Sequence, residues 1–101
     1  IETLVPPAVN GCKFVSQAAV ECGVKRIVFC SSIAAVLMQP HPVELYTPEH
    51  WTTEECRGIT PYDISKKESE KHLWDYQRSL PEDKKFELIT LCPALVIGPQ
   101  L

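Results

Sequence analysis

Four polar residues at two places in the sequence could together carry out proton-transfer chemistry. Ser31 and Ser32 directly follow an apolar run, and Tyr62 precedes Lys66 by four positions. Residues four apart lie on one face of a helix, so the Lys66 ammonium would lie near the Tyr62 phenol. A neighbouring cation favours the phenolate form of a tyrosine, which can then exchange a proton with a carbonyl or alcohol oxygen. A serine hydroxyl at the end of a neighbouring strand could hydrogen-bond the same oxygen.

The same spacing of tyrosine and lysine is common on exposed helices, where it indicates only a solvated face. We expect five charged residues around the motif to cover the solvent face of the helix: Lys66, Lys67, Glu68, Glu70 and Lys71. Context favours a chemical role for Lys66 among them. The motif opens a helix, follows a strand that ends in two serines and precedes another strand that ends in a proline.

The apolar pattern predicts the helices and strands that would position these residues. Apolar residues at steps of three and four predict a helix over residues 5–22, which Gly23 would end: Val9, Cys12, Val15, Ala19 and Cys22. The run 27–30 is typical of a strand buried on both faces in a parallel sheet, and residues 33–38 could extend it. A loop-rich stretch, a helix over 61–80, a strand over 86–91 and a further apolar run over 94–97 follow. This order predicts a doubly wound α/β fold.

Composition excludes several classes of protein. The chain has 101 residues, 45% of them apolar, and a formal net charge of −3, which is typical of a globular protein of one domain at most. The acidic balance and the lack of a basic stripe argue against nucleic-acid and anionic-membrane partners. No apolar run in the sequence approaches the length that a membrane-spanning helix needs.

The five cysteines are odd in number and show no C-x-x-C spacing, which favours free thiols in a reducing, cytoplasmic setting. Cys22, Cys30 and Cys92 border apolar segments, as buried thiols do, whereas Cys56 resembles a surface thiol. No spacing of cysteines and histidines resembles a zinc motif, so we expect no metal site.

Several ordered motifs together resemble the middle of the extended short-chain dehydrogenase/reductase family, also called the NAD(P)-dependent epimerase/dehydratase superfamily. The resemblance is strongest to its dihydroflavonol reductase and cinnamoyl-CoA reductase branch. It rests on P-A-V-N-G at residues 7–11, G-V-K-R-I-V-F-C-S-S at 23–32, Y-x-x-S-K-x-x-x-E-x-x-x-W at 62–74 and P-x-L-V-x-G-P at 93–99. The chain departs from the branch's pattern at four positions outside the proposed serine, tyrosine and lysine: Cys12, Cys30, Ser69 and Cys92.

The resemblance implies a partial Rossmann-type, doubly wound parallel sheet in an NAD(P)H-dependent oxidoreductase that reduces a small carbonyl or oxidises an alcohol. It implies that Tyr62 is the general acid/base, that Lys66 assists it and binds the nicotinamide ribose, and that both Tyr62 and Lys66 belong to the cofactor-binding site. Ser32 would polarise the substrate carbonyl, with Ser31 as the fallback. The residues expected to line the nicotinamide are Pro93, Ala94, Leu95 and Val96. NADP(H) is favoured over NAD(H) because it is usual in the branch, and the 62–80 helix could form a homodimer.

Residues 1–101 would be the central part of one NAD(P)-binding domain. The four glycines are not clustered, so the sequence lacks the family's glycine-rich phosphate loop, and it also lacks the C-terminal substrate domain. Both ends look cut, and we expect the isolated chain to be poorly stable and without turnover. Two alternatives stay open. One is a related sugar epimerase or 3β-hydroxysteroid-type dehydrogenase, and the other is a truncated, non-catalytic chain that acts as an interaction module.

Overall fold

Two long helices, one 3-10 helix and two strands make up the part of the chain that the computed structural model describes, residues 2–101. In chain order they are α1 (Val5–Glu21), β1 (Arg26–Cys30), η1 (Ile33–Ala35, the 3-10 helix), α2 (Pro61–Ser79) and β2 (Glu87–Leu91). The predicted helices and strands agree with these bounds to within one residue at either end. Two expectations were wrong. Residues 33–38 do not extend β1, because Ser32 caps η1 there, and the run 94–97 is not a strand.

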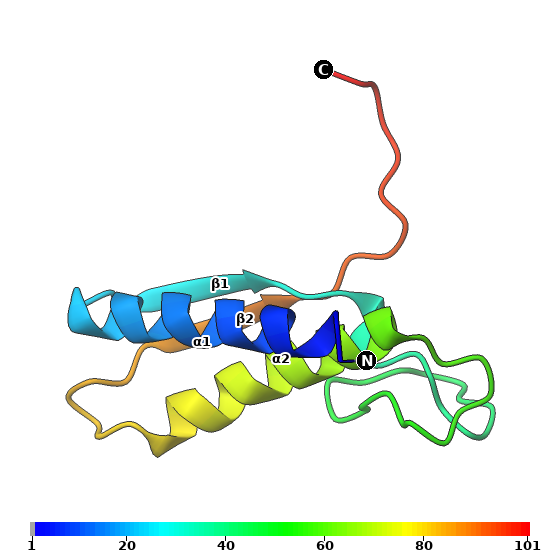
Figure 1. Ribbon diagram of the computed structural model, residues 1–101, viewed down its shortest axis with the longest axis horizontal. Coiled ribbons are helices and arrows are strands. Elements are labelled where there is room, and N and C mark those ends of the chain that lie inside the picture. Colours follow the sequence, from blue (N-terminus) through cyan, green and yellow to red (C-terminus); the bar gives the residue numbers. More distant parts are fainter. Residues whose placement is uncertain (1) are drawn as a thin grey trace.

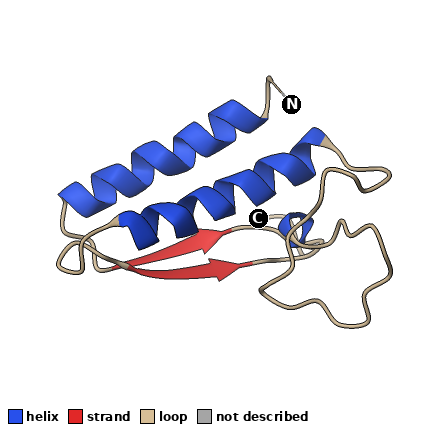
Figure 2. Ribbon diagram, turned by 90° about the horizontal axis from the view of Figure 1, so that it is seen from below, coloured by secondary structure: helices blue, strands red, loops and turns tan. Residues whose placement is uncertain are grey.

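The sheet is parallel, with Ile27 opposite Leu88 and Phe29 opposite Thr90. Both helices lie on the same side of it, and α1 packs along α2 (Figures 1 and 2). Because the strands are parallel, both end at the same edge of the sheet, beside η1 (Figure 1). Parallel strands joined through a helix confirm the predicted α/β class.

The core lies between the sheet and the helices, around the buried side chains of Leu73, Phe86 and Leu88. Successive strand residues point to opposite faces: Ile27 and Phe29 pack against the core, whereas Val28, on the other face, is 57% exposed. The expectation of a strand buried on both faces is therefore wrong for the described residues, because both helices cover the same face.

The face that α1 buries differs from the predicted apolar stripe. Val15 was expected in the stripe but is 70% exposed. Ser16 is buried instead, since its hydroxyl donates to the Lys13 carbonyl oxygen at 3.0 Å and needs no water. The helix ends as predicted, where Gly23 adopts a φ of +73° that favours glycine.

All five cysteines are free thiols, as expected, but their burial differs from the prediction. Cys22, Cys30 and Cys92 are exposed, because each lies at or just past the end of a helix or strand. Cys56 is half-buried, and its thiol donates to the Gln39 carbonyl oxygen at 3.3 Å.

The first turn of α2 is held by a capping box. The Thr60 hydroxyl accepts from the Asp63 amide at 3.3 Å, and an Asp63 carboxylate oxygen accepts from the Thr60 amide at 2.8 Å. Pro61 opens the helix, where its missing N–H is not needed. This turn carries Tyr62, so the cap also fixes the backbone position from which the Tyr62 side chain extends.

Replacing the cap is expected to weaken the protein measurably. Thr60→Ala removes the hydroxyl that accepts from the Asp63 amide and donates to the Asp63 carboxylate, and we expect it to lower the free energy of unfolding by about 1 kcal/mol. Urea unfolding of wild-type and variant proteins measures this loss. Thr3→Ala, at an exposed position before α1, serves as the control and should change stability little; equal stability of all three proteins would contradict the role of the cap.

Candidate active site

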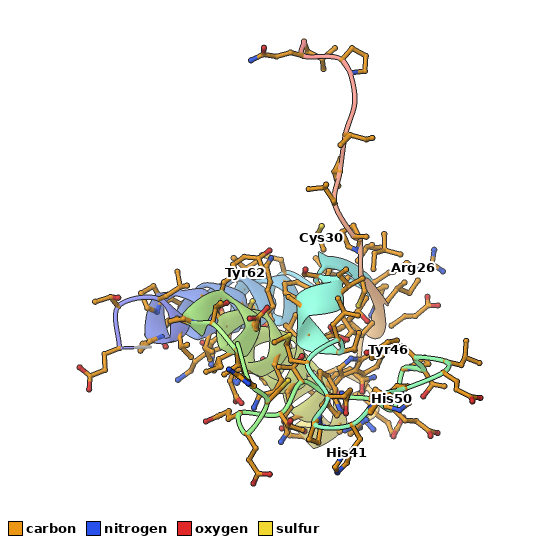
Figure 3. All side chains as sticks on the ribbon, turned by 90° about the vertical axis from the view of Figure 1, so that its right-hand side faces the viewer. Arg26, Cys30, His41, Tyr46, His50 and Tyr62 are labelled. Atoms are coloured by element: carbon orange, nitrogen blue, oxygen red, sulfur yellow. The ribbon has the colours of Figure 1, made fainter. Side chains whose placement is uncertain are left out.

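Elements that are far apart in the sequence meet at the edge where both strands end. Ser31 and Ser32 follow β1 directly, and η1 begins after Ser32. The 3-10 helix packs against α2, whose first turn lies at this edge (Figure 1). Figure 3 looks onto this edge and shows Tyr62 on the helix side and Cys30 at the end of β1. The structure thus brings the serines and the tyrosine–lysine helix to one edge, as the sequence analysis expected.

Tyr62 and Lys66 lie one turn apart on α2, as their spacing predicted. The Lys66 ammonium nitrogen is 5.7 Å from the centre of the Tyr62 ring, and the tyrosine is 49% exposed. A cation at this distance interacts favourably with an aromatic ring, and about half of the tyrosine stays open to solvent. The pair is therefore available to a ligand from outside.

The neighbouring lysine is engaged quite differently. The Lys67 ammonium pairs with Glu68 at 3.0 Å and Glu54 at 3.3 Å. Burial by itself would lower the pKa of Lys67, but these two carboxylates outweigh it and raise the pKa. Among the ion pairs formed by residues 2–101, none includes Lys66. Of the two adjacent lysines, Lys66 is the one whose ammonium is left for a ligand.

The two serines differ in what their hydroxyls do. Ser31 is buried, and its hydroxyl donates to a Glu70 carboxylate oxygen at 2.5 Å. Ser32 is only half-buried, and its hydroxyl oxygen accepts the Ala34 amide at 3.1 Å as the cap of η1. That bond occupies a lone pair and leaves the Ser32 hydroxyl hydrogen free to donate. Ser32 is therefore better placed than Ser31 to hydrogen-bond a substrate oxygen.

Glu70 was expected on the solvent face of α2, and this expectation was wrong. Its side chain is among the buried ones, at 6% exposure, and its carboxylate accepts from four donors. A carboxylate can be buried when hydrogen bonds replace its lost hydration. Helical spacing places Glu70 one turn beyond Lys66, but spacing alone does not distinguish a buried position from a solvated one.

A second buried polar residue, Thr52, was also missed by the sequence analysis. Its hydroxyl donates to the Ala34 carbonyl oxygen at 2.6 Å and accepts from the Met38 amide at 3.2 Å. Its own amide donates to the Ala35 carbonyl oxygen at 2.7 Å. Thr52 therefore fastens the long loop to η1 and supports the turn that begins at Ser32. No local pattern marks such a residue, because its partners lie up to 18 positions away.

The segment after β2 divides at Pro93. Its carbonyl oxygen accepts from the Ile33 amide at 3.1 Å, which keeps the start of the segment next to η1. From Ala94 the chain extends away from the other elements, and Leu95 and Val96 are 89% and 79% exposed (Figure 1). The structure thus places Pro93 at the strand edge but does not bring Leu95 and Val96 to Tyr62. A nicotinamide-lining role for residues 93–96 stays a prediction.

Cys92 lies between β2 and Pro93, close to the buried carboxylate. Its thiol is 3.7 Å from a Glu70 carboxylate oxygen. Although the residue as a whole is exposed, partial burial of its thiol and the negative charge of Glu70 raise the pKa of Cys92 above its ordinary value. A thiol kept in its neutral form is a poor nucleophile, so this cysteine fits a hydrogen-bonding role better than a catalytic one.

The other candidate features of the sequence do not assemble into a site. His50 accepts from the Thr47 amide at 3.0 Å, and the ring of His72 stacks on that of Tyr76 at 6.4 Å. His41, Tyr46 and His50 lie on the long loop, on the side away from Tyr62 (Figure 3). Nowhere in residues 2–101 do three or more histidine, cysteine, aspartate or glutamate side chains converge as metal ligands.

No helix in the described part of the chain is long and apolar enough to cross a membrane.

Parallel strands joined through a helix, with polar groups gathered where the strands end, define a Rossmann-like α/β domain. The chain belongs to the 3-beta hydroxysteroid dehydrogenase/isomerase family, whose sequence model matches residues 2–101. The resemblance to the epimerase/dehydratase superfamily, and to its reductase branch, is thereby confirmed.

Reductases are among the curated proteins that this chain is similar to. Cinnamoyl-CoA reductase 1 of Arabidopsis thaliana is 38% identical over 104 residues, which cover 99% of this chain and 29% of that protein. Dihydroflavonol 4-reductase of the same plant is 32% identical over 102 residues, which cover 95% of this chain and 26% of that protein. The chain thus spans less than a third of these relatives.

Solved structures confirm the Rossmann-like fold. Yeast methylglyoxal/isovaleraldehyde reductase Gre2, complexed with NADPH, superposes with a TM-score of 0.79 at 33% identity, over 96% of this chain and 32% of that one. The NADPH complex of Gre2 from Candida albicans gives the same TM-score and identity over 98% of this chain and 32% of that one.

Proposed function

We propose that this chain is the central part of the NAD(P)-binding domain of a reductase that acts on small carbonyl compounds. One observation carries the proposal. An ammonium free of ion pairs, that of Lys66, lies 5.7 Å from an accessible Tyr62 ring, on a helix that packs against the turn capped by Ser32. These three groups are what proton transfer to a carbonyl oxygen requires.

Each group has a distinct task in this proposal. The Ser32 hydroxyl donates a hydrogen bond to the carbonyl oxygen, and the Tyr62 phenol gives that oxygen its proton. The Lys66 ammonium favours the phenolate that remains and binds a ribose hydroxyl of the cofactor. The nicotinamide, when bound, supplies the hydride that the carbonyl carbon receives. NADP(H) is the favoured cofactor because the similar solved structures are NADPH complexes.

The test needs the protein that contains this chain together with the rest of the domain. It should consume NADPH in the presence of small aldehydes and ketones, and NADPH deuterated on the transferred position should give an alcohol deuterated at the former carbonyl carbon. A folded protein that binds NADPH but transfers no deuterium to any carbonyl compound would contradict the proposal. Parallel titration with NADH decides the cofactor preference.

A second candidate is favoured by the family match itself, whose name refers to oxidation of a hydroxyl group on a steroid. A 3β-hydroxysteroid-type dehydrogenase would reduce NAD(P)⁺ in the presence of a sterol alcohol, whereas an epimerase would return the hydride to its substrate without net consumption of cofactor. Measuring the direction and the net change of cofactor absorbance separates these activities from carbonyl reduction.

The difference between the two serines gives a further prediction. Ser32→Ala removes a donor to the developing negative charge on the carbonyl oxygen, and loss of one such donor costs about 100-fold or more in turnover. Ser31→Ala removes a hydroxyl that is occupied by Glu70, so we expect a fall of less than about 10-fold. Steady-state rates of the two variants, corrected for the folded fraction, make the comparison. The reverse order would assign the carbonyl contact to Ser31.

Two further expectations extend this proposal. The free thiols favour a reducing, cytoplasmic setting. We also expect a homodimer formed through the 62–80 helix, which sedimentation velocity of the complete protein at several concentrations would detect.

A further inference from the structure

We propose that Glu70 is a positioning residue whose hydrogen bonds hold the two strand ends against the helix that carries Tyr62 and Lys66. We call this set of hydrogen bonds the clasp. This inference rests on the proposed reductase function. It assigns to a residue outside the serine, tyrosine and lysine the task of setting their relative positions.

The donors to the Glu70 carboxylate come from three elements. One oxygen accepts from the Ser31 hydroxyl at 2.5 Å, just past β1, and from the Cys92 thiol at 3.7 Å, just past β2. The other accepts from the Thr90 hydroxyl of β2 at 2.9 Å and from the Trp74 indole N–H of α2 at 3.3 Å. The single carboxylate therefore joins both strands and the helix at the edge where the site lies.

The strand ends are tied to each other at the same level. The Ser31 amide donates to the Leu91 carbonyl oxygen at 2.8 Å, and the Ile33 amide donates to the Pro93 carbonyl oxygen at 3.1 Å. These bonds continue the parallel pairing beyond the strands and enclose Ser32. Ser32 therefore moves with Ser31 and with the end of β2, and Glu70 is what connects that unit to α2 by hydrogen bonds.

On the helix, Glu70 shares one face with the two residues it would position. It follows Lys66 by one turn and Tyr62 by two. A rigid helix carries a displacement at Glu70 to the phenol. Misplacement of reacting groups by about 1 Å can cost about 100-fold in rate, so a loose connection here would be visible in turnover.

The experiment compares Glu70→Ala, Glu70→Gln and a matched control. Leu73→Ala removes a buried side chain from the same helix and weakens packing without touching the clasp. Turnover is measured per molecule that binds NADPH, so that unfolded protein does not count. Glu70→Ala should lower this value by about 10- to 100-fold with little change in NADPH affinity. Leu73→Ala should lower it less than about 3-fold.

Glutamine tests whether the hydrogen bonds, rather than the charge, are what matters. Its carbonyl oxygen can still accept from Trp74 and Thr90, and its amide group can donate to a Ser31 hydroxyl that has turned round. Glu70→Gln should therefore recover most of the lost turnover. A glutamine variant as slow as the alanine variant would overturn the clasp.

A second measurement does not depend on activity. Glu70→Ala should speed hydrogen exchange at the Ser31 and Ile33 amides by about 10-fold more than at the β1 centre, whereas Leu73→Ala should raise exchange evenly along the strand. Even exchange in Glu70→Ala would overturn the proposal. If the wild-type protein transfers no hydride at all, the reductase function fails, and the exchange measurement still decides whether Glu70 clasps the strand ends.

Discussion

Tyr62→Phe is expected to lower turnover with NADPH and a carbonyl substrate by about 100- to 10,000-fold, the usual contribution of a positioned general acid. The substitution removes one oxygen and its proton. It leaves the ring beside the Lys66 ammonium, which lies 5.7 Å from the ring centre. NADPH affinity should therefore change little, and the loss should appear in the rate of the chemical step.

The matched control for this variant is Tyr46→Phe. Tyr46 is comparably exposed, at 40% against 49% for Tyr62, and its hydroxyl donates to the Leu37 carbonyl oxygen at 3.1 Å on the long loop. That loss should cost less than about 3-fold in turnover, because no reacting group depends on it directly. Full activity of Tyr62→Phe would remove the tyrosine from the mechanism and with it the main support for a reductase.

The second large effect is on stability. Phe86→Ala should lower the free energy of unfolding by about 3–5 kcal/mol, as expected when a large aromatic side chain is removed from a packed core. Phe86 is 2% exposed, and its ring lies 6.3 Å from that of Tyr76 and within the cluster that includes Leu73 and Leu88. Denaturant unfolding measures the loss.

Two further variants make this result interpretable. Phe86→Leu keeps much of the buried apolar area and should lose less than Phe86→Ala. Phe14→Ala removes the same type of side chain from α1, where it is 62% exposed, and surface changes of this kind usually alter stability by about 0.5 kcal/mol or less. Similar losses at both phenylalanines would show that the core does not lie between α2 and β2.

The secondary structure could be predicted from the sequence because its signals are local. The apolar run at β1, the proline that opens α2 and the glycine that ends α1 each act within a few residues of the boundary they set. The run 94–97 has the same composition as a strand but is extended and exposed, since an apolar run becomes a strand only where another strand can pair with it.

Part of the candidate site could also be predicted from the sequence. Tyr62 and Lys66 belong to one helix, so a spacing of four was enough to place the ammonium beside the ring. The sequence could not show which of the two serines is free to contact a substrate, because adjacent serines differ only in their surroundings in the fold. Burial and a bond to Glu70 occupy one hydroxyl, and the cap of η1 leaves the other free to donate.

The sequence by itself determined the order and type of the elements, the pairing of Tyr62 with Lys66 and the family to which the chain belongs, because each depends on neighbours along the chain. Only the tertiary structure decided that Glu70 is buried and that Thr52 fastens the loop to η1. A carboxylate leaves water only when several donors replace its hydration, and three of the four donors to Glu70 lie 20 or more positions away, on β2 or just past the ends of the two strands. The folded arrangement of the strand ends, not any local pattern, supplies these three donors.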